Sequence, residues 1–205
     1  LSSHFLLFQA ASGVKYLPMV EMDSLFTPFQ IGPVNFSGRV VLAPMDGYTD
    51  SPFRLLCREH GSAASISEFI NGIDVLNGHP HLKYKTYYTE AERPFVYQIF
   101  DDNPERLLET AKRLAEHQPD IIDINMGCPV RKIVGSGSGA AFLKDLDRIR
   151  QTVAVARAAT SRPLSVKIRI GFSPDAINVE ETVALIVGEG ADQITIHGRT
   201  REDSY

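Results

Sequence analysis

The stretch Ile121-Ile122-Asp123-Ile124-Asn125-Met126-Gly127-Cys128-Pro129-Val130-Arg131-Lys132 decides how the chain is interpreted. Its apolar first half is typical of a strand that is buried on both faces. Side chains alternate across a strand, so Asp123 and Asn125 share one face while the neighbouring isoleucines occupy the other. In a strand buried on both faces, each face is expected to be apolar. The two polar groups on this face, and the Cys128 thiol directly after them, therefore indicate a functional cavity on that side.

Bulk composition is that of an ordinary globular protein. The chain has 205 residues, of which 43% are hydrophobic and 22% charged, and its formal net charge is -4. That charge gives no global reason to expect a nucleic-acid partner, so any such site must be a local patch. Two cysteines in unlike contexts make no disulfide framework, which favours a reducing, cytoplasmic setting. No apolar stretch approaches the roughly 20 residues of a membrane span, so we expect no membrane association.

The N-terminal residues are left out of the fold prediction. Residues 1–21 lack a starting Met, and their apolar run His4-Phe5-Leu6-Leu7-Phe8 is too short and badly flanked for a signal peptide. We expect the natural start to be Met22 and residues 1–28 to be a non-native or disordered lead. The predicted folded domain spans residues 29–205.

Strand and helix patterns alternate along this domain. Strands are expected at 39–43, at 63–69, at Phe95–Phe100, in the opening apolar run, at Leu164–Arg169 and at Gln193–His197. Helices are expected from Asp50–Ser51 to Gly61, from Asn103–Pro104 onward, at 142–159 and at 179–189. A hairpin-like turn is expected at 35–38, and 72–92 is the least regular stretch.

This alternation predicts an α/β fold with a parallel sheet, either doubly wound or a (β/α)8 TIM barrel. The inward polar residues favour the barrel, because in a barrel the carboxyl ends of all strands meet at one mouth. Those residues, at or near the ends of successive strands, are Gln98, Asn125, Lys167, Arg169 and His197. We therefore predict a TIM barrel that is truncated after about six βα units, since the (β/α)8 repeat needs more.

Two residues carry the strongest chemical signals. Cys128 lies in a strand-to-loop turn, where it is either a packed thiol or a catalytic acid or nucleophile, with Arg131 and Lys132 close enough to tune it. Lys167 lies inside a strand, where it could form a Schiff base, hold an anionic cofactor or pair with Asp123. Cys57, by contrast, sits on an apolar helix and is interpreted as a core residue.

Other candidate sites are weaker. No His/Cys/Asp cluster has metal-ligand spacing, so we expect no metal. The glycine-rich run at 135–139 is either a flexible loop or a contact for a nucleic-acid backbone, and no Gly-Lys-Ser/Thr follows it. The window 131–150 has the local basic excess that a phosphate chain would need. Its basic residues are Arg131, Lys132, Lys144, Arg148 and Arg150, against Asp145 and Asp147.

Four motifs, in order, resemble those of the tRNA-dihydrouridine synthases. They are Leu42-Ala43-Pro44-Met45-Asp46-Gly47-Tyr48-Thr49-Asp50-Ser51-Pro52-Phe53-Arg54, Asp123-Ile124-Asn125-Met126-Gly127-Cys128-Pro129, Val166-Lys167-Ile168-Arg169-Ile170-Gly171 and His197-Gly198-Arg199-Thr200. The resemblance covers about residues 29–205. It implies a monomeric flavin mononucleotide (FMN) enzyme on a (β/α)8 barrel, which uses NADPH to reduce particular tRNA uridines to 5,6-dihydrouridine.

The resemblance also implies roles for individual residues. Pro44, Met45 and Asp46 would line the flavin, Gln98 would hydrogen-bond its ring, Lys167 and His197 would bind it further, Cys128 would donate a proton, and Asn125, Arg169 and Tyr205 would lie near the target uracil. Reduced flavin would deliver hydride to carbon 6 of uracil, and a neutral Cys128 thiol would protonate carbon 5 from the opposite face. Lys167 would stabilise the negative charge of the flavin.

One departure from the family matters. Its members continue into two further βα units, which complete the flavin phosphate site, and into a C-terminal helical domain that grips tRNA. We therefore expect activity of the full-length parent rather than of these residues in isolation. Two alternatives remain: another FMN barrel reductase, similar to dihydroorotate dehydrogenase, that acts on a free pyrimidine, or a non-catalytic RNA-binding barrel.

Overall fold

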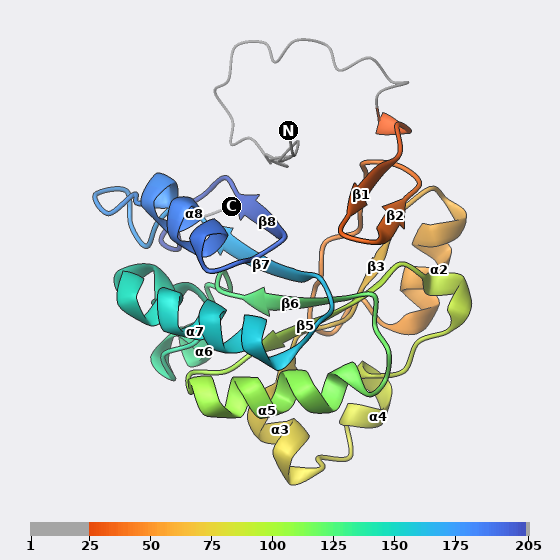
Figure 1. Ribbon diagram of the computed structural model, residues 1–205, viewed down its shortest axis with the longest axis horizontal. Helices are drawn as coiled ribbons and strands as arrows, with labels where there is room; N and C mark the ends of the chain where they lie inside the picture. Colours follow the sequence, from red (N-terminus) through yellow and green to blue (C-terminus); the bar gives the residue numbers. More distant parts are fainter. Residues whose placement is uncertain (1–24, 204–205) are drawn as a thin grey trace.

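The computed structural model describes residues 25–203, which form a curled parallel sheet with helices on its outer side (Figure 1). Strands β5 (Phe95–Phe100), β6 (Ile121–Asn125), β7 (Leu164–Arg169) and β8 (Gln193–His197) are consecutive neighbours in this sheet. They lie where the apolar, β-branched runs predict them, because a strand covered on both faces needs such residues at nearly every position.

The sheet is less regular on the other side of β5. Of the strand predicted at 63–69, two residues form β3 (Ser65–Ile66), and a second short strand, β4 (Ile70–Asn71), follows the predicted range; both pair with β5 in parallel. Between them the hydroxyl of Ser67 accepts a hydrogen bond from the backbone N–H of Gln98, at 3.1 Å. A side chain thus takes the place of a backbone carbonyl, which interrupts the ladder.

The strand predicted at 39–43 is wrong. Toward β3 it has a backbone hydrogen bond from Ala63 N to Val40 O at 2.7 Å and one from Leu42 N to the hydroxyl of Ser62 at 3.1 Å, and Arg39 N donates to Leu25 O, outside any strand, at 2.7 Å. Val40 is 50% exposed. In a closed barrel the first strand has a neighbour on each side, whereas no strand of residues 25–203 pairs with its outer side. One-sided contact does not hold this segment in a ladder.

A separate hairpin covers the end of the sheet opposite the strand carboxyl ends. It consists of β1 (Phe29–Ile31) and β2 (Val34–Phe36), with Gly32 in the turn at a φ of +54°. The turn predicted at 35–38 is therefore misplaced, because its first two residues belong to β2. The rings of Phe29 and Phe36 stack with centroids 4.6 Å apart, and both line a cavity of about 80 Å³ inside the curl of the sheet.

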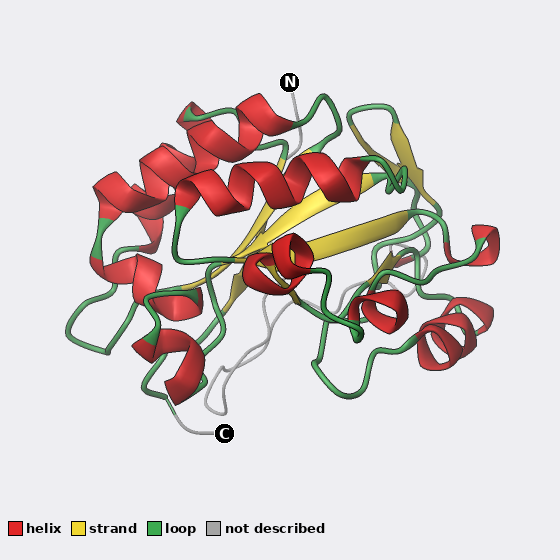
Figure 2. Ribbon diagram, turned by 90° about the horizontal axis from the view of Figure 1, so that it is seen from below, coloured by secondary structure: helices red, strands yellow, loops and turns green. Residues whose placement is uncertain are grey.

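The main helices lie side by side on the outer face, in the order of the strands (Figure 2). They are α3 (Gly72–Asn77), α5 (Pro104–Ala115), α7 (Leu146–Ala159) and α8 (Val179–Gly188). The remaining helical segments are α2 (Ser51–Glu59), α4 (Leu82–Lys85), η1 (Glu90–Glu92), α6 (Arg131–Gly135) and η2 (Gly139–Lys144).

Capping residues fix where several of these helices begin. Asp50 accepts a hydrogen bond from Phe53 N at the start of α2, as predicted. Asn103 likewise accepts a hydrogen bond from Arg106 N at the start of α5. Helix α7 begins later than predicted, because the Asp145 side chain caps it and 139–144 forms a separate 3-10 segment. The stretch predicted to be irregular, 72–92, contains α3, α4 and η1.

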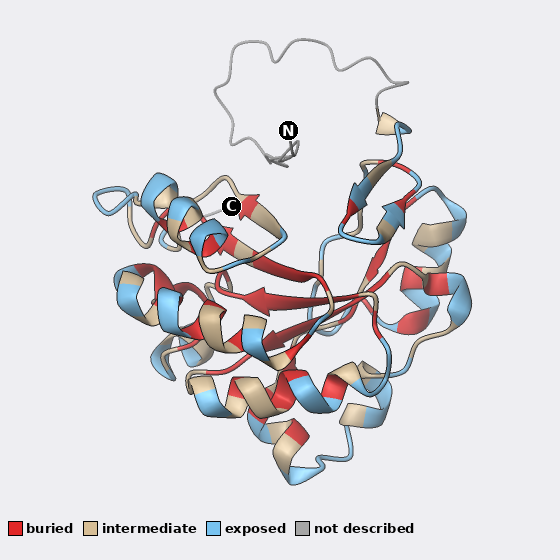
Figure 3. Cartoon of the chain, in the orientation of Figure 1, coloured by how far each residue is buried: buried red, intermediate tan, exposed pale blue. Residues whose placement is uncertain are grey.

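The two faces of the sheet are both buried but differ in polarity. On the outer face apolar side chains pack against the helices and form the main core; Ile122, Ile124 and Val166 are fully buried there. Figure 3 shows β5 and β6 coloured as buried along their length. The inner face carries polar groups that are also buried, among them Gln98 and Asp123. The predicted α/β barrel architecture is confirmed as a partial barrel. Within residues 25–203 no helix has the length and apolarity to cross a membrane.

Candidate functional site

The carboxyl ends of β5 to β8 bring the inward polar residues together, as predicted. In the sheet register Asn125 of β6 pairs with Lys167 of β7, and Arg169 of β7 pairs with His197 of β8. Gln98 of β5 pairs with Asp123 of β6 in the same register. Residues that are about 25 to 42 positions apart in the βα repeat thus become neighbours on one concave face.

A chain of hydrogen bonds links the two inward amides to a carboxylate. Gln98 Nε2 donates to Asp123 Oδ2 at 2.6 Å, and Asn125 Nδ2 donates to Gln98 Oε1 at 2.8 Å. The hydroxyl of Ser165 donates to the other oxygen of Asp123. Burial raises the pKa of Asp123, while the hydrogen bonds from Ser165 and Gln98 and the charge of Lys167 oppose that rise.

The loop that carries Cys128 is held from several directions. Asn125 Oδ1 accepts from the backbone N–H groups of Gly127, at 3.1 Å, and of Cys128, at 2.9 Å. Arg169 Nε donates to Gly127 O at 2.7 Å, and Ala140 N donates to Cys128 O at 3.0 Å. Each bond satisfies a backbone group that would otherwise be buried without a partner, so the position of the thiol is fixed.

Gly139 contributes to this loop by its small size. It has a φ of +58°, and a Cβ placed there would lie 2.7 Å from Cys128 O and 3.0 Å from Cys128 Cβ. No larger residue fits without moving the loop. The glycine-rich run at 135–139, interpreted from the sequence as a flexible loop or a phosphate contact, therefore includes a packing position against Cys128.

The surroundings of Cys128 keep its thiol protonated at neutral pH. Burial raises the pKa of Cys128 and Asp46 adds to the rise, whereas a backbone hydrogen bond at Val130 and the charges of Arg169 and Lys167 lower it, by less. The cations that act on the thiol are thus on β7. Arg131 and Lys132, expected to tune it, have exposed side chains and are not among the groups that act on it.

Burial lowers the pKa of two inward basic groups, Lys167 on β7 and His197 on β8. Burial lowers the pKa of Lys167, and Arg169 adds to this, while the Asp123 carboxylate opposes it. Asp123 and Lys167 form no ion pair, and among the contacts of residues 25–203 none is a hydrogen bond to Lys167 Nζ. Burial and the charges of Arg169, Lys167 and Arg199 lower the pKa of His197 to about 4, so its imidazole is neutral at pH 7.

The loop before α2 closes one side of the mouth. Asp46 forms an ion pair with Lys85 at 2.6 Å, and Gly47 N donates to Glu68 Oε1 at 2.6 Å. Asp46 is near enough to Cys128 to influence the pKa of its thiol. Pro44 and Met45 belong to the same loop, with Met45 40% exposed. Tyr205 lies outside the described residues.

Comparison with known proteins now supplies the family. Residues 41–205 match the family described as Dihydrouridine synthase (Dus). The chain is 34% identical over 177 residues to tRNA-dihydrouridine synthase B of Xanthomonas campestris pv. campestris, which covers 86% of this chain and 53% of that protein. It belongs to the dihydrouridine synthase family.

Other comparisons agree with this. The chain is 35% identical over 176 residues to tRNA-dihydrouridine synthase B of Pseudomonas aeruginosa, covering 86% of this chain and 53% of the relative. It is 33% identical over 192 residues to a probable tRNA-dihydrouridine synthase of Treponema pallidum, covering 91% and 56%. The chain thus spans about half the length of the curated relatives it matches. Its fold resembles that of histamine dehydrogenase from Rhizobium sp. 4-9, with a TM-score of 0.60 at 12% identity, over 85% of this chain and 37% of the other.

In this member of the dihydrouridine synthase family a buried ion pair anchors the first motif. Arg54 Nε lies 2.6 Å from Glu92 Oε2, and the two side chains are 1% and 0% exposed. Arg54 also donates to the carbonyls of Thr49, at 2.7 Å, and Tyr87, at 2.9 Å, and Ser51 donates to Glu92 at 2.8 Å. Sequence reasoning missed this network, whose only signal was an Arg on a helix face next to apolar residues.

The basic window at 131–150 is only partly free to meet a ligand. Arg148 is tied to the carbonyls of Gly137 and Asp102, both at 2.7 Å, and Arg150 pairs with Asp147 at 3.3 Å. The window's remaining basic residues have exposed side chains: Arg131, Lys132 and Lys144. The local positive patch is therefore smaller than its sequence suggests.

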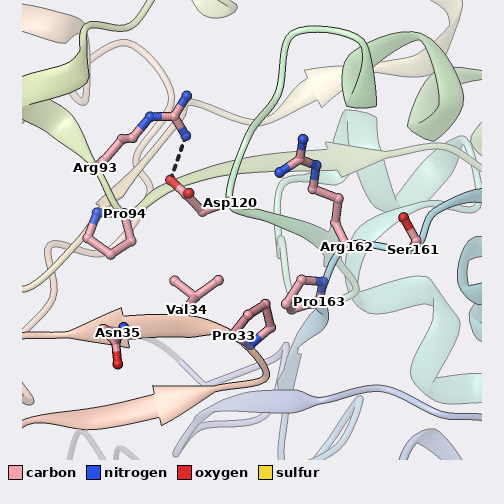
Figure 4. A pocket seen from close by; sticks show the side chains of 9 residues that line it. All are labelled: Pro33, Val34, Asn35, Arg93, Pro94, Asp120, Ser161, Arg162 and Pro163. Carbon is pink, nitrogen blue, oxygen red and sulfur yellow. Dashed lines mark hydrogen bonds and ion pairs between the residues drawn. The ribbon is translucent and has the colours of Figure 1, made fainter.

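A second cleft, of about 480 Å³, opens at the opposite end of the barrel (Figure 4). It lies between the tip of the β1–β2 hairpin and the segments that enter the strands, and an ion pair of 2.9 Å between Arg93 and Asp120 forms part of its wall. Its lining residues are Pro33, Val34, Asn35, Arg93, Pro94, Asp120, Ser161, Arg162 and Pro163. None is a candidate site residue. In the part of the chain that the structure describes, no cluster of three His, Cys, Asp or Glu residues could hold a metal ion.

Proposed function

We propose that this chain is the FMN-binding part of a tRNA-dihydrouridine synthase, which reduces specific tRNA uridines to 5,6-dihydrouridine with NADPH as the reductant. The observation that carries the proposal is the placement of Cys128 at the mouth of the barrel, on a loop held by Asn125 and Arg169 next to Lys167. Membership of the dihydrouridine synthase family and the names of the relatives support it.

The donor groups at the mouth fit FMN. Lys167 presents an ammonium group with no acceptor among residues 25–203, which suits the electron-rich edge of a flavin ring. The Gln98 amide keeps one N–H and one lone pair beyond its bonds to Asp123 and Asn125, so it can also bond to a ring edge. The residues that would hold the group are Pro44, Met45, Asp46, Gln98, Lys167 and His197.

Each protein group has a definite task in the proposed reaction. When bound, reduced FMN supplies the hydride that adds to carbon 6 of uracil. Cys128 Sγ donates its proton to carbon 5, which requires a neutral thiol. Asn125 has used both lone pairs of Oδ1 and one N–H, so the N–H that remains would donate to a uracil carbonyl oxygen. Arg169 and Tyr205 would lie at the same base, which must leave its stack at a cost of a few kcal/mol.

The setting of the reaction is part of the proposal. The partner is tRNA, the compartment is the cytoplasm and the protein acts as a monomer. Residues 29–205 would form the partial FMN-binding barrel; most of the lead predicted at residues 1–28 lies outside the described residues 25–203. The further length of the relatives would supply the two remaining βα units and a helical tRNA-binding domain.

Substitution of each cysteine by alanine, one at a time, tests the role of Cys128. In the complete protein that contains this chain, Cys128→Ala should leave flavin bound and slow dihydrouridine formation about 10²- to 10⁴-fold, the usual contribution of a general acid. The matched control, Cys57→Ala, removes a thiol on α2 and should leave turnover unchanged. Mass spectrometry of unmodified tRNA after incubation measures the product. Normal turnover by Cys128→Ala would refute its role as the acid.

Two further measurements separate the cofactor and the substrate. Lys167→Ala should lower the flavin content after purification, and unchanged occupancy would count against that assignment. The protein should reduce unmodified tRNA and ignore free uracil and orotate. Reduction of the free bases would instead favour a reductase that acts on small pyrimidines.

A further inference from the structure

Asp123 sets the direction of the buried hydrogen-bond chain that ends at Cys128. A carboxylate can only accept hydrogen bonds, so Gln98 has to turn Nε2 toward Asp123, and this leaves Oε1 for Asn125. Asn125 must then donate through Nδ2, so its oxygen faces the N–H groups of Gly127 and Cys128. The orientation of each amide follows from the one before it.

The opposite orientation would break the loop. With both amides turned over, Asn125 Nδ2 would face the two backbone N–H groups, and donors would meet donors. Each unsatisfied buried group costs about 1–3 kcal/mol. Asp123 is 4% exposed and Asn125 is 7% exposed, so water does not replace the lost partners readily.

We infer that Asp123 is a positioning residue for the Cys128 thiol, acting through Gln98 and Asn125. Asp123 lies too deep in the sheet to reach the mouth itself, because Asn125 and the loop follow it on β6. The same chain fixes which atoms Gln98 and Asn125 leave free for ligands. The position of Cys128 stands on the hydrogen bonds alone, and the consequence for catalysis rests on the proposed function.

Two substitutions distinguish the effect of the hydrogen-bond orientation from the effect of the negative charge of Asp123. Asp123→Asn keeps an oxygen that can accept from Gln98, and its amide can donate to the Ser165 hydroxyl; the charge near Lys167 is lost. Asp123→Leu has a similar volume and no acceptor. The matched control is Ser165→Ala, which removes the other hydrogen bond to Asp123 and leaves the chain to Asn125 intact.

The readout is the rate of alkylation of Cys128 by iodoacetamide between about pH 7 and 10, the range in which a thiol titrates. All variants carry Cys57→Ala, and alkylation is measured on the peptide that contains Cys128 by mass spectrometry, so other thiols do not contribute. Asp123→Leu should raise the rate at pH 8 about tenfold, because a released loop exposes the thiol and lets its pKa fall toward 9.0. Asp123→Asn and Ser165→Ala should stay within about twofold of the parent, since both keep the loop in place.

Two results would overturn the inference. One is a folded Asp123→Leu protein that reacts at the parent rate. The other is an Asp123→Asn protein that reacts as fast as Asp123→Leu, which would assign the effect to charge. If circular dichroism shows that Asp123→Leu does not fold, Gln98→Met breaks the same chain, and the parent rate in a folded Gln98→Met protein is equally decisive against it. The assay needs neither flavin nor tRNA, so its outcome is independent of the proposed function.

Discussion

The two parts of the molecule on either side of β5 are held together differently. Strands β5 to β8 form continuous ladders whose outer side chains belong to one apolar core. Residues 25–92 contribute short strands, a hairpin with its own smaller cluster and the buried Arg54–Glu92 pair. Strands β5, β6 and β7 have a strand on each side, and apolar packing holds their outer face against the helices. Where neighbours are lacking, specific polar contacts between loops take over.

The largest effect is expected when the polar anchor of residues 25–92 is broken. Glu92→Ala leaves Arg54 charged and without its partner in a dry site, and we expect a loss of about 3–5 kcal/mol in the free energy of unfolding. The control is Glu90→Ala, since Glu90 pairs with Arg93 but is 83% exposed, and it should cost less than about 1 kcal/mol. Urea unfolding measures both. Equal losses would show that this part does not depend on the buried pair.

Truncation of apolar side chains tests the difference in packing. Ile124 is fully buried in β6, so Ile124→Ala should lower the free energy of unfolding by about 2–5 kcal/mol. Val40 is 50% exposed in the segment that forms no strand, and Val40→Ala should change it by less than about 0.5 kcal/mol. A large effect at Val40 would mean that 39–43 belongs to the sheet after all.

A third prediction concerns how the free energy of unfolding depends on pH. Because the pKa of His197 is lowered to about 4 from 6.5, the unfolded chain takes up a proton before the folded one does as pH falls. Stability should therefore decrease between pH 6.5 and 4, by about 1–2 kcal/mol after allowance for the partial exposure of the ring. His197→Gln should remove this component.

The smallest effects are expected at the helix caps, and they should be alike in both parts. Asp50→Ala and Asn103→Ala each remove a side chain that accepts from the first turn of its helix. Each should cost about 1 kcal/mol in thermal or urea unfolding, because a cap acts on its own helix alone. A marked difference between the two would show that capping depends on the surrounding sheet.

Local signals in the sequence predicted much of the fold. The apolar runs gave the bounds of Phe95–Phe100, Leu164–Arg169 and Gln193–His197, and Asp50 and Asn103 marked the starts of α2 and α5. Each of these depends on a few adjacent residues. The segment 39–43 has equally strong strand propensity, but whether it forms a strand depends on neighbours that lie far away in the chain.

The site could be predicted only to the level of which strand ends meet. That Asn125, Lys167, Arg169 and His197 converge follows from the βα repeat. That Asp123 bonds to Gln98 and Ser165 rather than pairing with Lys167 depends on side-chain geometry across three strands. The partnership of Arg54 with Glu92 joins residues 38 positions apart and left no pattern in the sequence.

The close approach of Gly139 to Cys128 has a consequence for how such a site can vary. The reactive sulfur owes part of its position to an absent methyl group on a neighbouring segment. A search for important side chains, by truncation to alanine, would pass over this residue, since at glycine alanine is an addition. Gly139 leaves the space that the Cys128 loop occupies, and any substitution at Gly139 would place atoms in that space.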